Sequence, residues 1–176
     1  MVRFLTFTFS FLCLNSCMRY NEYGTYRVGL SKFTIKPNSD DRAYTIIDTN
    51  VIYRLVKNEG TNQPIIGEYY KFYSKGRVGK FNEQNVNLKT EKNLETKKGY
   101  MGYYNFDGRN FIVQFYNSNY NASELEKDIL TVSKDTIILT KPHFLKKDDS
   151  IPYALTKFFL IKESIPKNIK ITKPDW

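Results

Sequence analysis

The chain has 176 residues, a net charge of +9, two cysteines and one histidine. This length suits one domain with a core of its own. Two cysteines are too few for a disulfide framework, and these residues offer no ligand set with the spacing of a zinc site. We therefore expect a domain that is stabilised by packing, without a metal or a cofactor.

An apolar run near the N-terminus predicts an export signal. Residues 4–14 are mostly apolar and follow the positively charged Arg3. The run is too short to span a bilayer, which needs about 20 residues, but it has the form of a signal-peptide core. Residues 1–16 are therefore predicted to be a cleavable signal peptide.

The run closes with Leu14-Asn15-Ser16-Cys17, which resembles a lipobox, the sequence around the lipid-modified cysteine of bacterial lipoproteins. The resemblance implies that Cys17 becomes an N-terminus acylated with chains such as palmitate, because lipidation needs a thiolate nucleophile. Asn15 departs from the Ala, Ser or Thr that is usual there. Two alternatives stay open: a buried strand with a disulfide, and an ordinary signal peptide, which would prefer a small residue in place of Leu14.

The predicted tether, residues 17–25, is short and polar. A lipid anchor at its start would hold the domain close to the membrane. Only Glu22 supplies an acidic group, so the acidic run that sends some lipoproteins to the cell surface is missing, and we expect an outer-membrane anchor that faces the periplasm. The basic charge either attracts the protein to anionic envelope components or keeps it soluble. Export excludes nucleic acid as a partner.

From Tyr26 onward, β-branched and aromatic residues alternate with polar ones between turn formers, which is typical of half-buried antiparallel strands. The first predicted strands cover 28–35, with a bulge, 44–47 and 51–56. A turn at 48–50 separates the last two, because Asp and Asn side chains favour turns.

Two hairpins follow. Residues 66–73 turn through 74–76 into 77–81, with Gly76 placed to take a positive φ. A second hairpin joins 100–106 to 111–116 across Asp107-Gly108, a strong turn sequence. We expect the polar stretch between them, 82–98, to be a long exposed loop.

The last third of the chain continues the strand pattern. Residues 123–126 are expected to form one short helical turn, since Ser123 suits a cap and Glu126 lies three residues on. Further strands are predicted over 129–132, 136–140 and 153–161. The tail, residues 166–176, is basic and lacks a strong period.

About eight or nine short strands, with no helices repeated between them, predict an all-β fold. We expect an antiparallel meander over residues 26–165 that closes into a barrel, because closure removes exposed edge strands. A β-sandwich is the alternative.

Segments 69–78, 99–104 and 135–139 resemble small bacterial lipoproteins with a lipocalin-like barrel, and the likeness spans residues 44–162. The resemblance implies a lipocalin-like barrel behind a lipid anchor. Its motifs are strand and turn patterns, so it implies no functional residue except Cys17.

The residues that could carry catalysis are few. His143 follows a proline in a segment between strands, and a triad would need it beside a nucleophile. Asp40-Asp41 and Asp148-Asp149 lie in sequences typical of solvated loops rather than of a glycosidase pocket. The glycines of 76–79 and 99–102 lack the spacing of a phosphate-binding loop and are interpreted as close-packing positions. We therefore expect no enzyme activity.

The tyrosines are the positive clue to function. Neighbouring tyrosines point to opposite faces of a strand, and each offers an apolar ring with a hydroxyl. Seven of them fall on the two predicted hairpins: Tyr69, Tyr70, Tyr73, Tyr100, Tyr103, Tyr104 and Tyr116. The inward set either fills the barrel or lines a ligand cavity. We expect a non-catalytic binding or accessory protein for a small hydrophobic or amphipathic ligand, or alternatively a subunit that docks another envelope protein.

Overall fold

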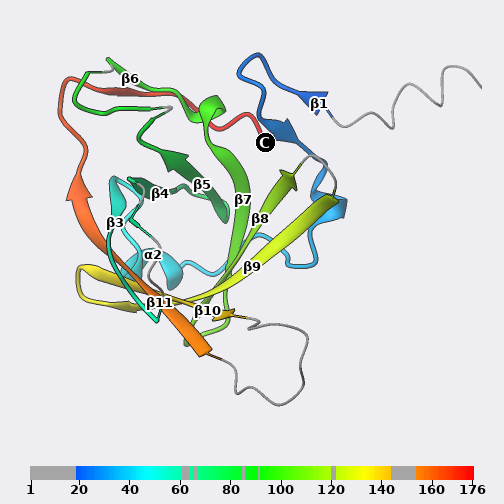
Figure 1. Cartoon of the computed structure of the whole chain (residues 1–176), viewed down its shortest axis with the longest axis vertical. Coiled ribbons are helices and arrows are strands. Elements are labelled where there is room, and N and C mark those ends of the chain that lie inside the picture. Colours follow the sequence, from blue (N-terminus) through cyan, green and yellow to red (C-terminus); the bar gives the residue numbers. More distant parts are fainter. Residues whose placement is uncertain are drawn as a thin grey trace, which may run out of the picture.

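The computed structural model describes residues 19–60, 64–65, 67–84, 86–90, 92–119, 122–143 and 154–176, with the backbone alone for 19, 117–124, 142–143 and 154. Eight antiparallel strands form a closed barrel (Figure 1). They are β3 (Val51–Glu59), β4 (Glu68–Phe72), β5 (Arg77–Asn82), β7 (Tyr100–Phe106), β8 (Phe111–Asn119), β9 (Ala122–Ser133), β10 (Thr136–His143) and β11 (Ala154–Ser164). The predicted all-β, lipocalin-like barrel is confirmed, and the sandwich alternative is wrong.

Each barrel strand pairs with the next one along the chain, and β11 returns to pair with β3. In this closing pair Leu160 lies opposite Leu55 and Phe159 opposite Lys57, so Val56 is an extra residue in β3. Such a bulge bends a strand locally. Closure leaves none of the eight strands with an unpaired edge.

Smaller elements surround the barrel. β1 (Arg19–Tyr20) pairs with β2 (Tyr26–Arg27), and β6 (Asn93–Leu94) pairs in parallel with β12 (Lys170–Ile171). Among the described residues, the helical segments are the 3-10 helices η2 (Leu30–Lys32) and η3 (Thr96–Lys98) and the α-helix α2 (Ala43–Ile46).

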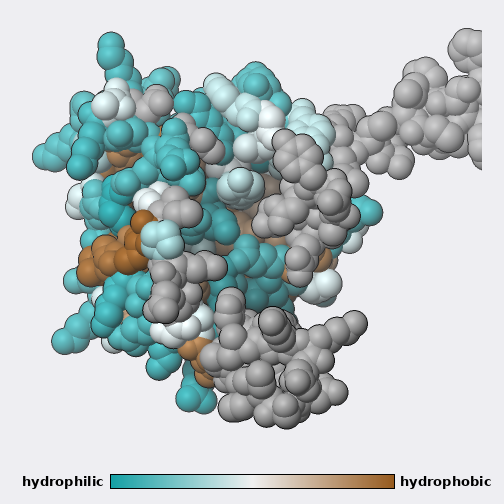
Figure 2. All heavy atoms as spheres, viewed as in Figure 1, coloured by the Kyte–Doolittle hydropathy of each residue, from teal (hydrophilic) through white to brown (hydrophobic). Residues whose placement is uncertain are grey.

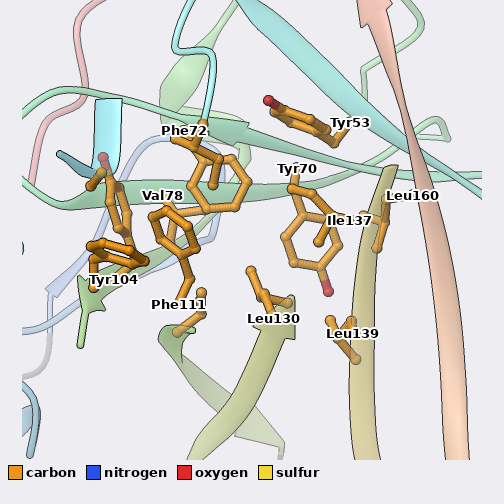
Figure 3. Close-up of a cluster of buried hydrophobic side chains, with 14 of the residues drawn as sticks. Tyr53, Tyr70, Phe72, Val78, Tyr104, Phe111, Leu130, Ile137, Leu139 and Leu160 are labelled. Atoms are coloured by element: carbon orange, nitrogen blue, oxygen red, sulfur yellow. The ribbon is translucent and has the colours of Figure 1, made fainter. Parts of the chain in front are cut away.

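Aromatic and aliphatic side chains fill much of the barrel interior. Phe72 packs edge-to-face on Tyr53 at 5.6 Å and on Tyr104 at 5.3 Å between ring centroids. Tyr70 lies near Leu130 and Leu139 in the same cluster (Figure 3). Period-2 alternation sends these six residues inward from five strands. Their burial is the main source of stability, since no disulfide joins the described residues.

One end of the barrel is closed. The tight turns β4–β5, β7–β8 and β9–β10 lie at this end, and the turn of α2 covers it with buried Ala43 and Ile47. The prediction of a strand over 44–47 is wrong. The segment crosses the barrel end, where no strand can pair with it, so its backbone bonds internally, from Ile47 N–H to the Ala43 carbonyl at 2.9 Å.

Two other local predictions are also wrong. Residues 28–35 form no strand but cross the outer face of β8, where the Gln114 side chain accepts hydrogen bonds from the N–H groups of Thr34 and Ile35 at 2.9 and 3.2 Å. The helical turn expected at 123–126 lies within β9, whose residue Glu126 is opposite Phe115. Long-range pairing overrides a local capping preference here.

The polar stretch 82–98 is only partly exposed. Val86, Leu88 and Leu94 are buried against the outward rings of Tyr69 and Phe81. Strand alternation points those two rings away from the interior, so they need a cover outside the barrel. The expectation of a long exposed loop is therefore wrong.

The C-terminal residues 166–176 lie on the outside of the barrel and are called the strap below. The strap contributes buried Ile169 to the cover and pairs with β6 through β12. Trp176 donates its indole N–H to the Gly102 carbonyl at 3.2 Å, and Asp175 pairs with Arg27 at 2.8 Å. Figure 1 shows the strap ending beside β2, so both ends of the described chain meet on one side of the barrel.

The predicted hairpins are confirmed. β4 and β5 meet at a turn where Gly76 has a φ of 65°, and β7 and β8 meet at a turn where Gly108 has a φ of 95°. A Cβ on Gly76 would lie 2.8 Å from the carbonyl carbon of Pro37, whereas a Cβ on Gly108 would meet nothing within 4 Å. Gly76 is thus required for its conformation and for its small size.

Gly76→Ala is expected to lower the free energy of unfolding by about 3 kcal/mol, because strain from a positive φ adds to a backbone clash. The matched change Gly108→Ala carries the strain alone and is expected to lower it by about 1 kcal/mol. Urea unfolding of both variants measures the difference. Equal losses would show that the packing of the 37–38 backbone on this turn contributes nothing.

Candidate functional site

The barrel end opposite α2 is called the mouth. A hollow of about 220 Å³ opens there. Its lining combines aromatic rings with charged and polar side chains: Glu68, Lys80, Phe81, Asn82, Tyr100, Phe115, Tyr116 and Glu126. The interior is therefore filled toward the closed end and hollow at the mouth.

Five charged side chains, here called the mouth cluster, gather at this end: Glu68, Lys80, Glu126, Asp128 and Lys141. Strand alternation explains their position, because each lies an even number of positions from an inward core residue of its own strand. Lys80 follows Val78 by two positions, Lys141 follows Leu139 by two, and Glu68 precedes Tyr70 by two. The sheet thus places charges on the same inward face as the core.

Glu126 is the centre of the mouth cluster. One of its oxygens pairs with the Lys80 ammonium at 3.2 Å, and the other accepts a hydrogen bond from Lys141. Burial would raise the pKa of Glu126, but the two lysines outweigh burial and lower it. Glu126 is therefore a carboxylate at neutral pH, and it fixes both ammonium groups inside the barrel.

Asp128 lies deeper than Glu126 on the same face of β9. Its side chain is 2% exposed, and Oδ1 lies 3.7 Å from the Lys141 ammonium. Its Oδ2 is buried and has no hydrogen-bond partner among the described residues. Burial therefore raises the pKa of Asp128 to about 6, against the attraction of Lys141. A carboxyl group in such a place is destabilising when it is ionised.

Glu68 differs from the other carboxylates of the cluster. It lines the main hollow and also a smaller one of about 30 Å³ beside Tyr70 and Lys141. Within the described part of the chain, the Glu68 side chain has no hydrogen bond and no ion pair within 4.0 Å, and it attracts the Lys141 ammonium only at longer range. The mouth cluster holds three carboxylates and two ammonium groups, and Glu126 and Asp128 hold the close contacts to the lysines, so Glu68 is the carboxylate in excess.

Aromatic rings complete the mouth. The Lys80 ammonium lies 5.9 Å from the ring centroid of Tyr100 and 5.5 Å from that of Phe115. Tyr100 is 42% exposed, whereas Phe115 is 1% exposed. The rim thus offers an accessible ring above a buried one, with a cation between them.

The tyrosines fall on two sides of the sheet, as alternation predicts. Tyr70 and Tyr104 point into the barrel core. Tyr69, Tyr73, Tyr103 and Tyr116 are buried on the outer face, under the cover of neighbouring segments. Most of the seven therefore fill space, and Tyr100 and Tyr116 reach the hollow.

The candidate residues singled out in the sequence do not form this site. Cys17 and Asp148-Asp149 lie outside the described residues, and of His143 only the backbone is described, opposite Ala154. Asp40 is paired with Arg42 at 2.6 Å beside α2, and Asp41 is exposed.

Sequence reasoning missed the mouth cluster, although the alternation of β4, β5, β9 and β10 carries it. A charged residue in phase with inward core residues was the available signal. The prediction that the glycines of 76–79 and 99–102 are close-packing positions agrees with the structure. A Cβ on Gly79 or on Gly99 would lie 2.7 Å from the ring of Phe81.

Two kinds of site find no support within the described ranges. No group of three or more His, Cys, Asp or Glu side chains is arranged to hold a metal ion there. Likewise, no helix among those residues is long and apolar enough to cross a membrane.

The outer surface is mostly hydrophilic, with a hydrophobic patch over the region of β3 and β11 (Figure 2). Val56 and Ile161 are 42% and 46% exposed there. Ile161 lies between Arg54 and Thr136 in the sheet, so polar residues interrupt the patch. Isolated apolar side chains are normal on surfaces.

The fold and the site define a small antiparallel β-barrel with a filled core and a charged, aromatic mouth. Comparison with protein-family models, with curated proteins and with solved structures finds no match to this chain.

Asp128→Asn is expected to change how stability depends on pH. Because the folded-state pKa of Asp128 is raised to about 6, the stability from its protonated form is fully present below pH 4 and is lost as the pH rises through 6. Relative to Asp128→Asn, the wild type should lose about 3 kcal/mol of unfolding free energy across this window. Urea unfolding from pH 4 to pH 7 measures it, and parallel pH profiles would contradict it.

Proposed function

We propose that this chain is an envelope-anchored lipoprotein whose barrel is a non-catalytic binding module for a small amphipathic molecule. The ligand enters the mouth, its cationic group meets Glu68, and its short apolar part lies against the rings of Tyr100 and Phe115. The observation that carries the proposal is the excess Glu68 carboxylate, which makes no ion pair with a described residue and lines a hollow with aromatic walls.

The charges of the mouth cluster favour a ligand with a cationic group. The two lysines of the cluster are already in contact with carboxylates: Lys80 with Glu126, and Lys141 with Glu126 and Asp128. A ligand carboxylate would meet three carboxylates of the mouth cluster, whereas a ligand ammonium would gain an ion pair with Glu68. A charge-assisted hydrogen bond in a partly desolvated site is stronger than one in water.

Size supports a short ligand. The hollow of about 220 Å³ is smaller than the roughly 300–1,000 Å³ of pockets for drug-sized molecules. The core below it is packed with Tyr70, Leu130 and Leu139, so a long chain has no room to descend. A chain of about six carbons with a polar end suits the space.

The anchor follows from the sequence. Leu14-Asn15-Ser16-Cys17 resembles a lipobox, and two or three acyl chains on Cys17 would hold the protein on a membrane, at about 0.8 kcal/mol per buried CH₂. β1 begins two residues after Cys17, so the barrel would stay close to the lipid surface. We place the protein on the periplasmic face of the outer membrane.

Hexylamine is expected to bind the full chain saturably and about tenfold more tightly than hexanol, because one charge-assisted contact to Glu68 separates them. Hexanoate is expected not to bind. Isothermal titration calorimetry with the three matched probes measures this order. If hexylamine fails to bind, or if hexanol and hexanoate bind as well as it does, the ligand class is wrong.

Glu68→Gln is expected to remove the preference for hexylamine over hexanol while leaving the fold intact, since Glu68 makes no ion pair in the described structure. The control is Glu59→Gln, a change at an exposed carboxylate on the same barrel end that pairs with the exposed Lys57. An equal effect of both variants would assign the preference to the overall charge instead of the mouth.

Cys17→Ser is expected to abolish lipid labelling, because a serine hydroxyl lacks the nucleophilicity of a thiolate. Metabolic labelling of bacterial cells with a clickable fatty acid measures it. The wild type should be labelled and the variant should not. An unlabelled wild type, or equal labelling of the variant, would overturn the lipoprotein assignment. Neither result would bear on the proposed ligand site at the mouth.

A further inference from the structure

A second hollow, of about 310 Å³, lies outside the barrel between the β4–β5 turn and the strap. It is called the basic groove. The titratable side chains that line it are Lys71, Tyr73, Arg77 and Lys173, and no carboxylate is among the lining residues. The groove is on the side of the closed end, away from the mouth.

Lys71 is the most unusual residue of the basic groove. It is 2% exposed, and its ammonium donates hydrogen bonds to the carbonyl oxygens of Thr49 and Phe72, the latter at 3.1 Å. The ammonium also lies 4.9 Å from the ring centroid of Tyr73. Within the described ranges it forms no ion pair within 4.0 Å, and burial lowers its pKa to about 8 against the longer-range attraction of Asp48. A buried charge without a close counter-charge is destabilising.

The other cations of the groove are equally unmatched. Neither Arg77 nor Lys173 has an ion pair or a side-chain hydrogen bond in the described part of the chain. Elsewhere on the surface, Arg27, Arg42, Arg54 and Lys162 are all paired with carboxylates. The groove therefore concentrates three cations that form no ion pair with a described residue.

A buried hydroxyl adds to the polar groups beside the groove. Tyr73 is 9% exposed, and its hydroxyl has no hydrogen-bond partner among the described residues. Buried polar groups without partners are rare in folded proteins. Among the described residues, the groove thus combines cations that form no ion pair with a hydroxyl that has no hydrogen-bond partner.

We propose that the basic groove binds a phosphate group, with Arg77 and Lys173 as direct contacts and Lys71 as the buried counter-charge. A guanidinium presents a planar fork that matches two phosphate oxygens, and an ammonium adds a point charge. This site is separate from the mouth, and its ligand has the opposite charge. The phosphate belongs either to a small soluble phosphate ester or to a phospholipid headgroup.

The full chain is tested with inorganic phosphate, with glycerol 3-phosphate, and with phosphatidylcholine vesicles that contain or lack phosphatidic acid. Calorimetry follows the soluble probes and co-sedimentation follows the vesicles. Saturable binding of a soluble probe identifies a soluble ester as the ligand. Binding only to vesicles with phosphatidic acid identifies a headgroup. No saturable binding to any of these probes would overturn the site.

The double variant Arg77→Gln/Lys173→Gln is expected to weaken this binding at least about tenfold, since two charged contacts are lost. The control, Lys89→Gln/Arg109→Gln, removes the same charge from exposed positions outside the groove. Equal weakening by both pairs would mean non-specific attraction and would also overturn the site.

Lys71→Met tests the buried counter-charge. It is expected to weaken phosphate binding; if it prevents folding, the Arg77/Lys173 pair still decides the question. Glu68→Gln is expected to leave phosphate binding unchanged, so failure at the groove and failure at the mouth remain distinguishable.

Discussion

The pairing of β11 with β3 is the constraint on which the rest of the structure depends. It turns an eight-stranded meander into a barrel, and closure fixes which alternate residues of every strand share one limited interior. Residues of the opposite phase, such as Tyr69 and Phe81, must then be covered from outside. That cover comes from residues of 26–35, from Val86, Leu88 and Leu94 after β5, and from the strap.

The same constraint divides the interior into two parts. Toward α2 the inward residues are aromatic and aliphatic and pack without charge. At the mouth the inward residues are charged, and the lysines are tolerated because Glu126 pairs with both of them. Paired charges at this depth exclude close apolar packing, so the mouth stays hollow. The proposed binding site therefore lies where the inward residues of the strands change from apolar to charged.

Local sequence patterns predicted the strands and the tight turns, because these depend mainly on residues that are close together in the chain. Alternation located β3 to β5 and β7 to β11, and turn residues located the hairpins at Gly76 and Gly108. The failures occurred where a tertiary contact decides: residues 44–47 are helical because they cross the barrel end, and Val86 and Leu88 are buried because two outward rings need a cover. The mouth cluster was missed because Lys80 and Glu126 become neighbours only when β5 and β9 are brought around the closed barrel. The lipobox lies outside the described residues and remains a prediction.

The central claim is that the hollow at the mouth, and not the filled core or the outer face, receives the ligand. Nuclear Overhauser effects between the alkyl protons of bound hexylamine and the aromatic protons of the chain test it most directly. The account predicts contacts to the rings of Tyr100 and Phe115 and none to Phe72 or Tyr104 near the closed end. Contacts to Phe72 or Tyr104, or contacts confined to outer-face rings such as Phe33 and Tyr103, would contradict it.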